Sequence, residues 1–322
     1  MRSAAYQMHM PSLPRLPSPL DTALDRLLIG YGNLGYLARR SGWDQHLPRL
    51  DGKVAIVTGA KTGLGRAAAK GMAELGATVR LAVRGREDGE RVKAELAAEV
   101  PAADLAVDEL DVSSLRDVRA YAAAFEGPLH VLVHNAGVMP AEREETEEGH
   151  ERMLATHVLG PHLLTKLLRP AMPAGARVIW VASGGMYGQK LRADDLQYLR
   201  DDYKPTTGYA RTKRAQVVLS ELWAEELRGD GIVSHAMHPG WADTPGIATS
   251  LPGFRRLTGP ILRTHEQGAD TIVWLAAADQ PSSSSGRFWH DRRERPTHYA
   301  GRTREGAADR RALWEACEAL TA

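Results

Sequence analysis

The sequence predicts an α/β fold in which helices cover both faces of a parallel sheet. Short apolar runs alternate with helical segments from residue 53 onward, a glycine-rich turn follows the first run, and no break in composition divides the chain. Such an alternation produces right-handed crossovers between parallel strands. We therefore predict a doubly wound, three-layer sandwich with seven parallel strands.

The first predicted strand, Val54–Val57, is a continuous apolar run, as expected of a strand that is buried on both faces. Similar runs predict the later strands at residues 78–83, 105–110, 129–133, 177–181, 232–237 and 287–289. Apolar residues at helical spacing predict the helices between and after them. These helices cover residues 67–75, 86–99, 115–125, 147–168, 207–227, 271–277 and 308–320. Pro161 predicts a kink in the helix 147–168.

Residues 51–322 are expected to form a single domain, preceded by an extension over residues 1–50. Residues 1–18 are rich in Pro and Ser, and apolar residues then recur at helical spacing between residues 20 and 31. The extension therefore carries one amphipathic helix. Three roles stay open for it: packing on the domain, contact with a membrane surface, or a cover over the active site.

Composition excludes several classes of function. The chain has 41 basic and 40 acidic residues, so no strong field attracts nucleic acid or an anionic membrane. We interpret the mixed-charge run Asp291–Arg295 as a solvated surface. No apolar stretch is long enough to span a membrane, and no secretory leader is recognisable. The single cysteine, Cys317, fits a cytoplasmic location, and no cluster of His, Cys, Asp and Glu predicts a metal site.

The turn after the first strand predicts a site for a dinucleotide. Gly59, Gly63 and Gly65 permit a tight turn, a close approach of backbone to a pyrophosphate, and close helix packing. The helix that follows supplies N–H groups and partial positive charge. The next strand ends in Val83 and Arg84, where NAD enzymes usually carry a carboxylate. A guanidinium suits a 2′-phosphate instead, so we expect NADP (NADPH), with NAD as the alternative cofactor.

A tyrosine and a lysine, Tyr209 and Lys213, share one face of a predicted helix. The whole set of motifs resembles the short-chain dehydrogenase/reductase family, and within it the member-twelve branch, which is akin to retinol dehydrogenases. The resemblance covers residues 51–290. It rests on Thr58-Gly59-x-x-x-Gly63-x-Gly65, His134-Asn135-Ala136-Gly137, Ser183, Tyr209-x-x-x-Lys213, Pro239-Gly240 and Thr244.

The resemblance implies a Rossmann-type fold and a role for each matching residue. Tyr209 would act as general acid, Lys213 would lower the pKa of Tyr209 and bind the nicotinamide ribose, and Ser183 would hydrogen-bond the substrate oxygen. The implied cofactor-binding residues are Thr58, Gly59, Lys61, Thr62, Gly63, Leu64, Gly65, Arg84, Asp111, Val112, Asn135, Ala136, Gly137, Tyr209, Lys213, Pro239, Gly240 and Thr244.

One position departs from the family pattern. His157 stands where relatives carry an asparagine that supports a water-linked proton path. Because a histidine can both donate and accept, we include it among the catalytic candidates, with a packed histidine as the alternative. Residues 184–208, between Ser183 and Tyr209, are interpreted either as a wall of the substrate pocket or as a surface loop.

The expected protein is an NADP-dependent oxidoreductase that interconverts a ketone or aldehyde and an alcohol, and its substrate is expected to be a small, lipophilic molecule. The rival interpretation is a dinucleotide-binding sensor or scaffold with little or no catalysis. The resemblance further implies a homo-oligomer that associates through its long helices.

Overall fold

The computed structural model describes residues 21, 25, 29–242 and 261–322. Its strands form one sheet in the order β3-β2-β1-β4-β5-β6-β7-β8. They are β1 (Val54–Thr58), β2 (Thr78–Val83), β3 (Asp104–Glu109), β4 (Val131–His134), β5 (Arg177–Val181), β6 (Val233–Met237), β7 (Arg287–His290) and β8 (Arg293–Arg295). The doubly wound α/β fold is confirmed.

The prediction of seven strands was one short. Neighbours from β3 to β7 pair in parallel, as predicted, but β8 pairs with β7 in the antiparallel sense. The three residues of β8 belong to the mixed-charge run Asp291–Arg295, which we interpreted as a solvated surface. A period-two apolar pattern, which would mark a strand in the sequence, is therefore missing from it.

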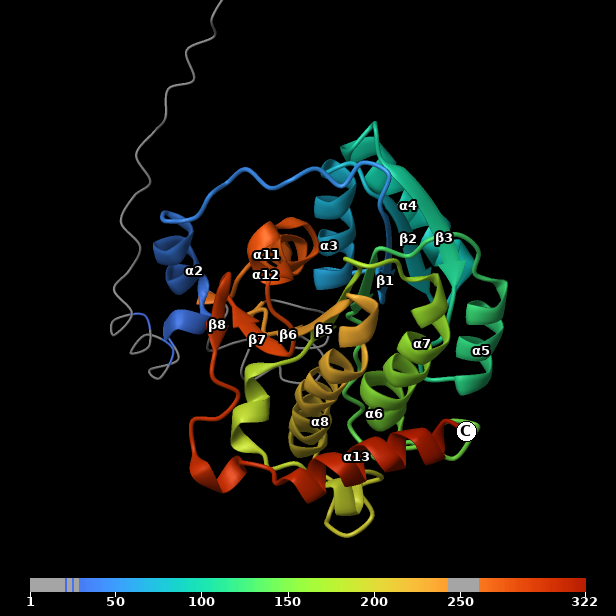
Figure 1. Cartoon of the computed structure of the whole chain (residues 1–322), viewed down its shortest axis with the longest axis vertical. Coiled ribbons are helices and arrows are strands. Elements are labelled where there is room, and N and C mark those ends of the chain that lie inside the picture. Colours follow the sequence, from blue (N-terminus) through green and yellow to red (C-terminus); the bar gives the residue numbers. More distant parts are fainter. Residues whose placement is uncertain (1–20, 22–24, 26–28, 243–260) are drawn as a thin grey trace, which may run out of the picture.

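Helices lie on both faces of the sheet, as Figure 1 shows. One face is covered by α3 (Gly63–Glu74), α4 (Arg86–Glu99) and α11 (His265–Ala277), and α12 (Asp279–Ser282) follows α11. The other face is covered by α5 (Leu115–Ala124), α6 (Arg152–Leu154), α7 (Gly160–Leu168) and α8 (Pro205–Glu226). Each layer closes its own hydrophobic core against the sheet, so the sheet is buried on both faces.

The helix predicted over residues 147–168 is interrupted. It begins at Arg152, where the Glu151 carboxylate caps the N–H groups of the first turn, and Ala155–Leu159 form a π turn before α7. Pro161 has no N–H, so the carbonyl of His157 loses its usual helical partner. The predicted kink is therefore a change of helical register centred on His157, of a kind that is frequent at functional sites.

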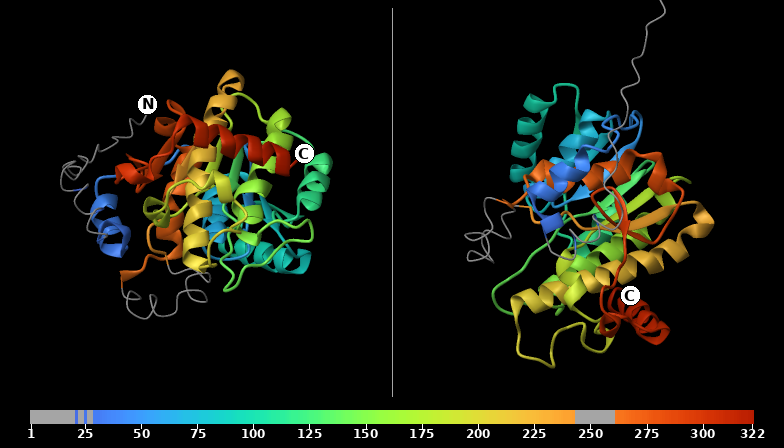
Figure 2. Two further views of the ribbon diagram at one scale, coloured as in Figure 1. Left: turned by 90° about the horizontal axis from the view of Figure 1, so that it is seen from below. Right: turned by 90° about the vertical axis from the view of Figure 1, so that its left-hand side faces the viewer.

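The C-terminal helix α13 (Ala307–Leu320) lies across the layer formed by α7 and α8, most clearly in the left view of Figure 2. Leu313 and Cys317 are fully buried in the core of that layer. The Trp314 ring packs edge-on against Trp223 of α8, with 5.2 Å between centroids. The C-terminal helix therefore covers part of both long helices.

The N-terminal segment packs against the edge of the sheet that β7 and β8 form. Its described elements are the short helix η1 (Ile29–Tyr31) and α2 (Asn33–Arg40), and α2 lies beside β8 in Figure 1. Arg39 is buried and donates to carboxylate oxygens of Asp25 and Asp291, both at 2.6 Å.

The interpretation of Asp291–Arg295 as a solvated surface was wrong for the two ends of the run, whereas Glu294 is exposed and Arg292 and Arg293 are half-buried. Asp291 is 1% exposed and Arg295 is 8% exposed. Asp21 of the N-terminal segment accepts hydrogen bonds from Arg293 and Arg295, at 2.7 and 2.6 Å. An acid from a distant part of the chain makes the burial of Arg295 tolerable, and composition alone cannot reveal such a partner.

Candidate active site

The predicted site residues follow the carboxyl ends of neighbouring strands, along one edge of the sheet. Gly59 follows β1, Arg84 follows β2, Asn135 follows β4, Ser183 follows β5 and Pro239 follows β6. The strand order reverses between β1 and β4, and the helices that follow these two strands lie on opposite faces. A switch point of this kind opens a crevice in which α/β folds bind ligands.

The Thr58 hydroxyl joins the glycine loop to the segment after β4. It donates to the Val133 carbonyl at 3.1 Å and accepts from the backbone N–H groups of Asn135 and Ala136, at 3.0 and 3.1 Å. The Asn135 side-chain amide donates to the Thr58 carbonyl at 2.9 Å. Gly59 has a φ of +67°, and a Cβ there would lie 2.9 Å from Ala136 Cα. Glycine is therefore required at this turn.

The first turn of α3 supplies the expected backbone donors. A Cβ at Gly65 would lie 2.4 Å from both the Gly59 carbonyl oxygen and Asn135 Nδ2, so the loop and the helix are in close contact. The N–H groups of Gly63 and Leu64 begin this helix, where backbone donors have no intrahelical acceptor. Among the remaining loop residues, Lys61 and Thr62 are exposed. The turn thus presents the backbone N–H groups at the start of α3, and the Lys61 ammonium lies on the same loop.

The other cofactor candidates follow neighbouring strands. Arg84 is exposed just after β2, whose Ala82 carbonyl accepts from the Gly59 N–H at 2.9 Å. Asp111 follows β3, and its carboxylate accepts from the Ser113 N–H at 2.9 Å. Val112 is buried beside it, while Gly137 and Gly240 follow β4 and β6. Thr244 lies outside the described residues.

Tyr209 and Lys213 lie one turn apart on α8, as their spacing predicts. Lys213 Nζ is 5.5 Å from the centre of the Tyr209 ring. The Ser183 hydroxyl, at the end of β5, acts on the Tyr209 phenol and lowers its pKa. Lys213 is buried, and its ammonium donates to the Val181 carbonyl at 2.8 Å and to the Gln216 amide oxygen at 3.0 Å. Ser183, Tyr209 and Lys213, three of the four catalytic candidates, therefore form one cluster.

The expected lowering of the Tyr209 pKa by Lys213 stays a prediction, because burial dominates this pKa in the structure. Burial raises the pKa of Tyr209 to about 12, and the hydrogen bond from Ser183 offsets only part of that effect. Burial also lowers the pKa of Lys213 to about 7. Both shifts follow from removing charge from water, and the Lys213 hydrogen bonds point to Val181 and Gln216. Tyr209 is thus protonated at neutral pH, as a proton donor must be.

His157 is fully buried at the π turn, and its ring meets the Tyr209 ring edge-on with 5.4 Å between centroids. Its Nε2 accepts from the Val138 N–H at 3.0 Å, so its Nδ1 carries the proton and donates to the Thr212 hydroxyl at 2.8 Å. Burial, and then the nearby Lys213 charge, hold the pKa of His157 well below its usual range. A neutral imidazole thus links the segment after β4 to the catalytic helix.

The segment after Ser183 is held against α8 by two arginines. Buried Arg214 donates to the carbonyls of Met186 and Gln189, at 3.0 and 3.2 Å. Arg211 lies 4.3 Å from the centre of the Tyr198 ring.

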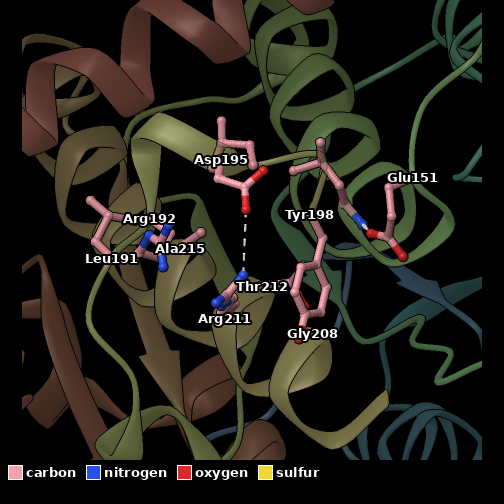
Figure 3. A pocket seen from close by; sticks show the side chains of 11 residues that line it. Glu151, Leu191, Arg192, Asp195, Tyr198, Gly208, Arg211, Thr212 and Ala215 are labelled. Atoms are coloured by element: carbon pink, nitrogen blue, oxygen red, sulfur yellow. Dashed lines mark hydrogen bonds and ion pairs between the residues drawn. The ribbon is translucent and has the colours of Figure 1, made fainter. Parts of the chain in front are cut away.

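A small pocket lies between this segment and α8, shown in Figure 3. Asp195 and Arg211 pair across it at 3.6 Å, and Glu151 and Thr212 also line it. Its lining contains none of the three catalytic candidates. Part of the segment therefore packs away from the catalytic cluster, and its role as a wall of the substrate pocket stays a prediction.

The sequence interpretation missed several buried side chains that support the cluster. Thr212 and Gln216 lie on α8 beside the catalytic pair, and His238 precedes Pro239. Thr212 is three residues after Tyr209, and Gln216 is three residues after Lys213. Helical spacing alone could therefore have predicted both contacts. Arg214 gave no such signal, because an arginine on a helix is ordinarily exposed.

Comparison with known proteins now identifies the family. Residues 53–252 match the family model described as short chain dehydrogenase. The chain belongs to the short-chain dehydrogenase family. It is 41% identical over 278 residues to dehydrogenase/reductase SDR family member 12 of Bos taurus, covering 84% of this chain and 87% of that protein. It is also 34% identical to retinol dehydrogenase 12 of Homo sapiens, with 84% and 87% covered.

Solved structures agree with this assignment. An uncharacterised protein of Mycobacterium paratuberculosis superposes with a TM-score of 0.70 at 29% identity, covering 85% of this chain and 95% of that one. A 3-ketoacyl-(acyl-carrier-protein) reductase of Brucella melitensis, complexed with NADH, gives a TM-score of 0.58 at 25% identity, with 74% and 96% covered. The chain is accordingly an NAD(P)-dependent oxidoreductase that acts on CH–OH groups.

The described residues offer neither a metal site nor a membrane-spanning helix. In the part of the chain that the structure describes, no group of three or more His, Cys, Asp or Glu side chains is arranged to hold a metal ion. Among the same residues, no helix is both long and apolar enough to cross a membrane.

Burial of the Lys213 ammonium predicts a pH-dependent stability. Because its pKa falls from 10.5 in the unfolded chain to about 7, the unfolded chain binds more protons between these values. The contribution of Lys213 to stability therefore rises with pH across this window and is constant below it. Relative to wild type, Lys213→Met should become more stable as the pH falls from 10 to 7, by at least about 1 kcal/mol.

Urea unfolding at several pH values measures this difference. Lys93→Met, which removes an exposed ammonium, is the matched control and should show no such trend. A constant difference between Lys213→Met and wild type across the window would contradict the lowered pKa.

Proposed function

We propose that the protein is an NADP-dependent oxidoreductase that interconverts a ketone or aldehyde and an alcohol, with Ser183, Tyr209 and Lys213 as catalytic residues. The observation that carries this proposal is their convergence: the buried Lys213 ammonium lies 5.5 Å from the centre of the Tyr209 ring, and the Ser183 hydroxyl acts on the phenol of the same ring. A pair made only for packing would not need a buried ammonium, whose desolvation is costly.

The crevice fits a dinucleotide. Gly59 and Gly65 let the loop pack closely against residues 135–136 and the start of α3, and the N–H groups there face an anion favourably. The pyrophosphate would lie on Gly59 to Gly65, the adenosine would be held by Arg84, Asp111 and Val112, and the nicotinamide end by residues 135–137 and 239–240. When bound, the nicotinamide supplies or accepts the hydride.

The remaining chemistry is proton transfer and charge stabilisation by the chain itself. In the direction of reduction, protonated Tyr209 would donate to the carbonyl oxygen, and Ser183 would hydrogen-bond that oxygen as charge develops. Lys213 would stabilise the phenolate that remains, since a positive charge favours the ionised form. His157 would hold Tyr209 in place through Thr212, and a proton relay through His157 stays a prediction.

The substrate is proposed to be a lipophilic carbonyl compound or alcohol. This chain is 37% identical to polyprenol dehydrogenase of Mus musculus, with 83% of each chain covered, and it is similar to retinol dehydrogenases. The names of these relatives denote apolar alcohols. The alternative, a dinucleotide-binding sensor or scaffold without turnover, is disfavoured by the intact cluster around Tyr209.

Removal of the phenol tests the catalytic proposal. Tyr209→Phe deletes the proton donor, so reduction of an aldehyde accepted by the wild type should fall by at least about 100-fold. NADPH binding, followed by fluorescence, should change little, because the ring remains. The control is Tyr121→Phe, which alters a partly buried phenol on α5 that donates to Asp108. Full activity in Tyr209→Phe would refute the assigned role.

The choice between NADP and NAD is proposed to rest on Arg84. Arg84→Ser removes the guanidinium proposed for the 2′-phosphate, so the Kd for NADPH should rise by about tenfold or more. The Kd for NADH should stay within about twofold. Arg91→Ser, on the exposed face of α4, serves as the control. Equal losses for both cofactors, or none, would contradict the assignment.

Cellular location and assembly are separate proposals. A cytoplasmic location stays a prediction. The expected homo-oligomer also stays a prediction, and its interface would have to avoid the part of α7 and α8 that α13 covers. Contact of the N-terminal segment with a membrane surface is favoured by one observation: Leu34 and Leu37 of α2 are 67% and 48% exposed.

Flotation with liposomes tests that contact. If α2 touches a membrane, wild-type protein should float with vesicles, and the double variant Leu34→Ser, Leu37→Ser should float several-fold less. The exposed Leu199, in the segment after Ser183, provides the control variant Leu199→Ser. Equal flotation of all three proteins would remove the proposal.

A further inference from the structure

His238 is a buried histidine that the catalytic proposal does not use. It lies between the last residue of β6 and Pro239, and it is 3% exposed. Its Nδ1 accepts a hydrogen bond from the Gly184 N–H at 3.1 Å. Gly184 is bonded directly to Ser183, so this contact fixes the backbone on one side of the serine that reaches Tyr209.

The protonation of His238 is set by this contact. Since Nδ1 accepts, the proton of the neutral ring is on Nε2, and burial holds the pKa of His238 well below its usual range. Nε2 has no protein partner among the described residues. A Cβ at Gly184 would lie 2.9 Å from Nε2, so the ring also lies close against this backbone. His238 therefore accepts a hydrogen bond from the turn after β5, and its ring also prevents the backbone of this turn from moving closer.

The His238 ring is held by aromatic contacts from two other parts of the chain. It stacks on His290 of β7, with 4.9 Å between centroids and 25° between planes. Tyr31 of the N-terminal segment meets its edge at 4.7 Å and 84°. The His290 Nδ1 donates to the His238 carbonyl at 2.9 Å. Ring and backbone of His238 are thus fixed together, in part by the N-terminal segment.

The same N-terminal segment holds the backbone that follows His238. The Tyr31 carbonyl accepts from the Trp241 N–H at 2.8 Å. Arg263 donates to the carbonyls of Gly30 and Gly32, at 2.7 and 3.2 Å, and its guanidinium lies against Gly240, where a Cβ would be 2.4 Å away. These contacts place residues 239–241 between the N-terminal segment and the crevice.

We propose that His238 is a positioning residue for Ser183, and that residues 29–32 are part of the active-site structure because they hold His238 and residues 239–241 in place. The proposal rests on the proposed role of Ser183. It gives the N-terminal segment a function in catalysis that differs from a surface anchor: without it, the serine hydroxyl would lose its alignment with Tyr209.

The test compares two substitutions at His238. His238→Leu removes the acceptor for the Gly184 N–H, whereas His238→Asn offers an oxygen close to the place of Nδ1. His238→Leu should lower kcat for an aldehyde substrate by about tenfold or more, because a small misplacement of a catalytic group is costly. KM and the Kd for NADPH should change less than about threefold. His238→Asn should recover most of kcat.

Amide hydrogen exchange supplies a readout that needs no substrate. The Gly184 amide, followed in a peptide that covers residues 182–188, should exchange at least about tenfold faster in His238→Leu and in Tyr31→Ala than in wild type. If the wild type reduced no aldehyde, the proposed function would fail, and the exchange rates would still decide whether His238 fixes this backbone.

The matched control is His235→Leu. His235 lies on the same strand, is buried, and accepts from the Arg287 N–H at 3.2 Å, away from the catalytic cluster. It should lose thermal stability without loss of kcat and without faster exchange at Gly184. Equal loss of kcat in both leucine variants, or wild-type kcat and wild-type exchange in His238→Leu, would overturn the proposal.

Discussion

The hydroxyl of Thr58 is the point on which the geometry of the site depends. It bonds the segment after β4 to the end of β1, where the strand order reverses and the crevice opens. The same segment after β4 carries the Val138 N–H, which donates to His157. His157 donates to the Thr212 hydroxyl, and this hydroxyl donates to the Tyr209 carbonyl. The dinucleotide loop and the catalytic helix are therefore positioned by one connected network, and an error in one part would displace the other.

Two groups of buried charge serve different ends in this molecule. The arginines and aspartates at the far edge of the sheet are mutually paired, so their burial is compensated and ties the N-terminal segment to β7 and β8. Among the described residues, the Lys213 ammonium donates to neutral oxygens, those of Val181 and Gln216, and no carboxylate there is recorded as its partner. The cost of burying this charge is typical of a functional site and not of a structural contact.

Most of the fold could be predicted from the sequence because local patterns determine it. Apolar runs and the glycine loop predicted the parallel strands and the switch point, and the spacing of Tyr209 and Lys213 predicted two of the three residues of the catalytic cluster. The eighth strand was missed because its residues are charged, and two of them, Arg293 and Arg295, pair with Asp21, more than 270 residues away. The support of Ser183 by His238 was missed for a similar reason: no local pattern indicates a contact between turns that follow two different strands.

The position of the N-terminal segment has a consequence for the order of folding. Arg39 is synthesised early, but its partner Asp291 lies 252 residues later in the chain. The contact therefore cannot form until nearly the whole sheet has been made, and contacts of such high sequence separation form slowly. During synthesis the buried arginine and the aspartates beside it remain in water, where their charges are well solvated. Arg39 is thus made before almost all of the sheet but docks after it, and its docking completes the native state.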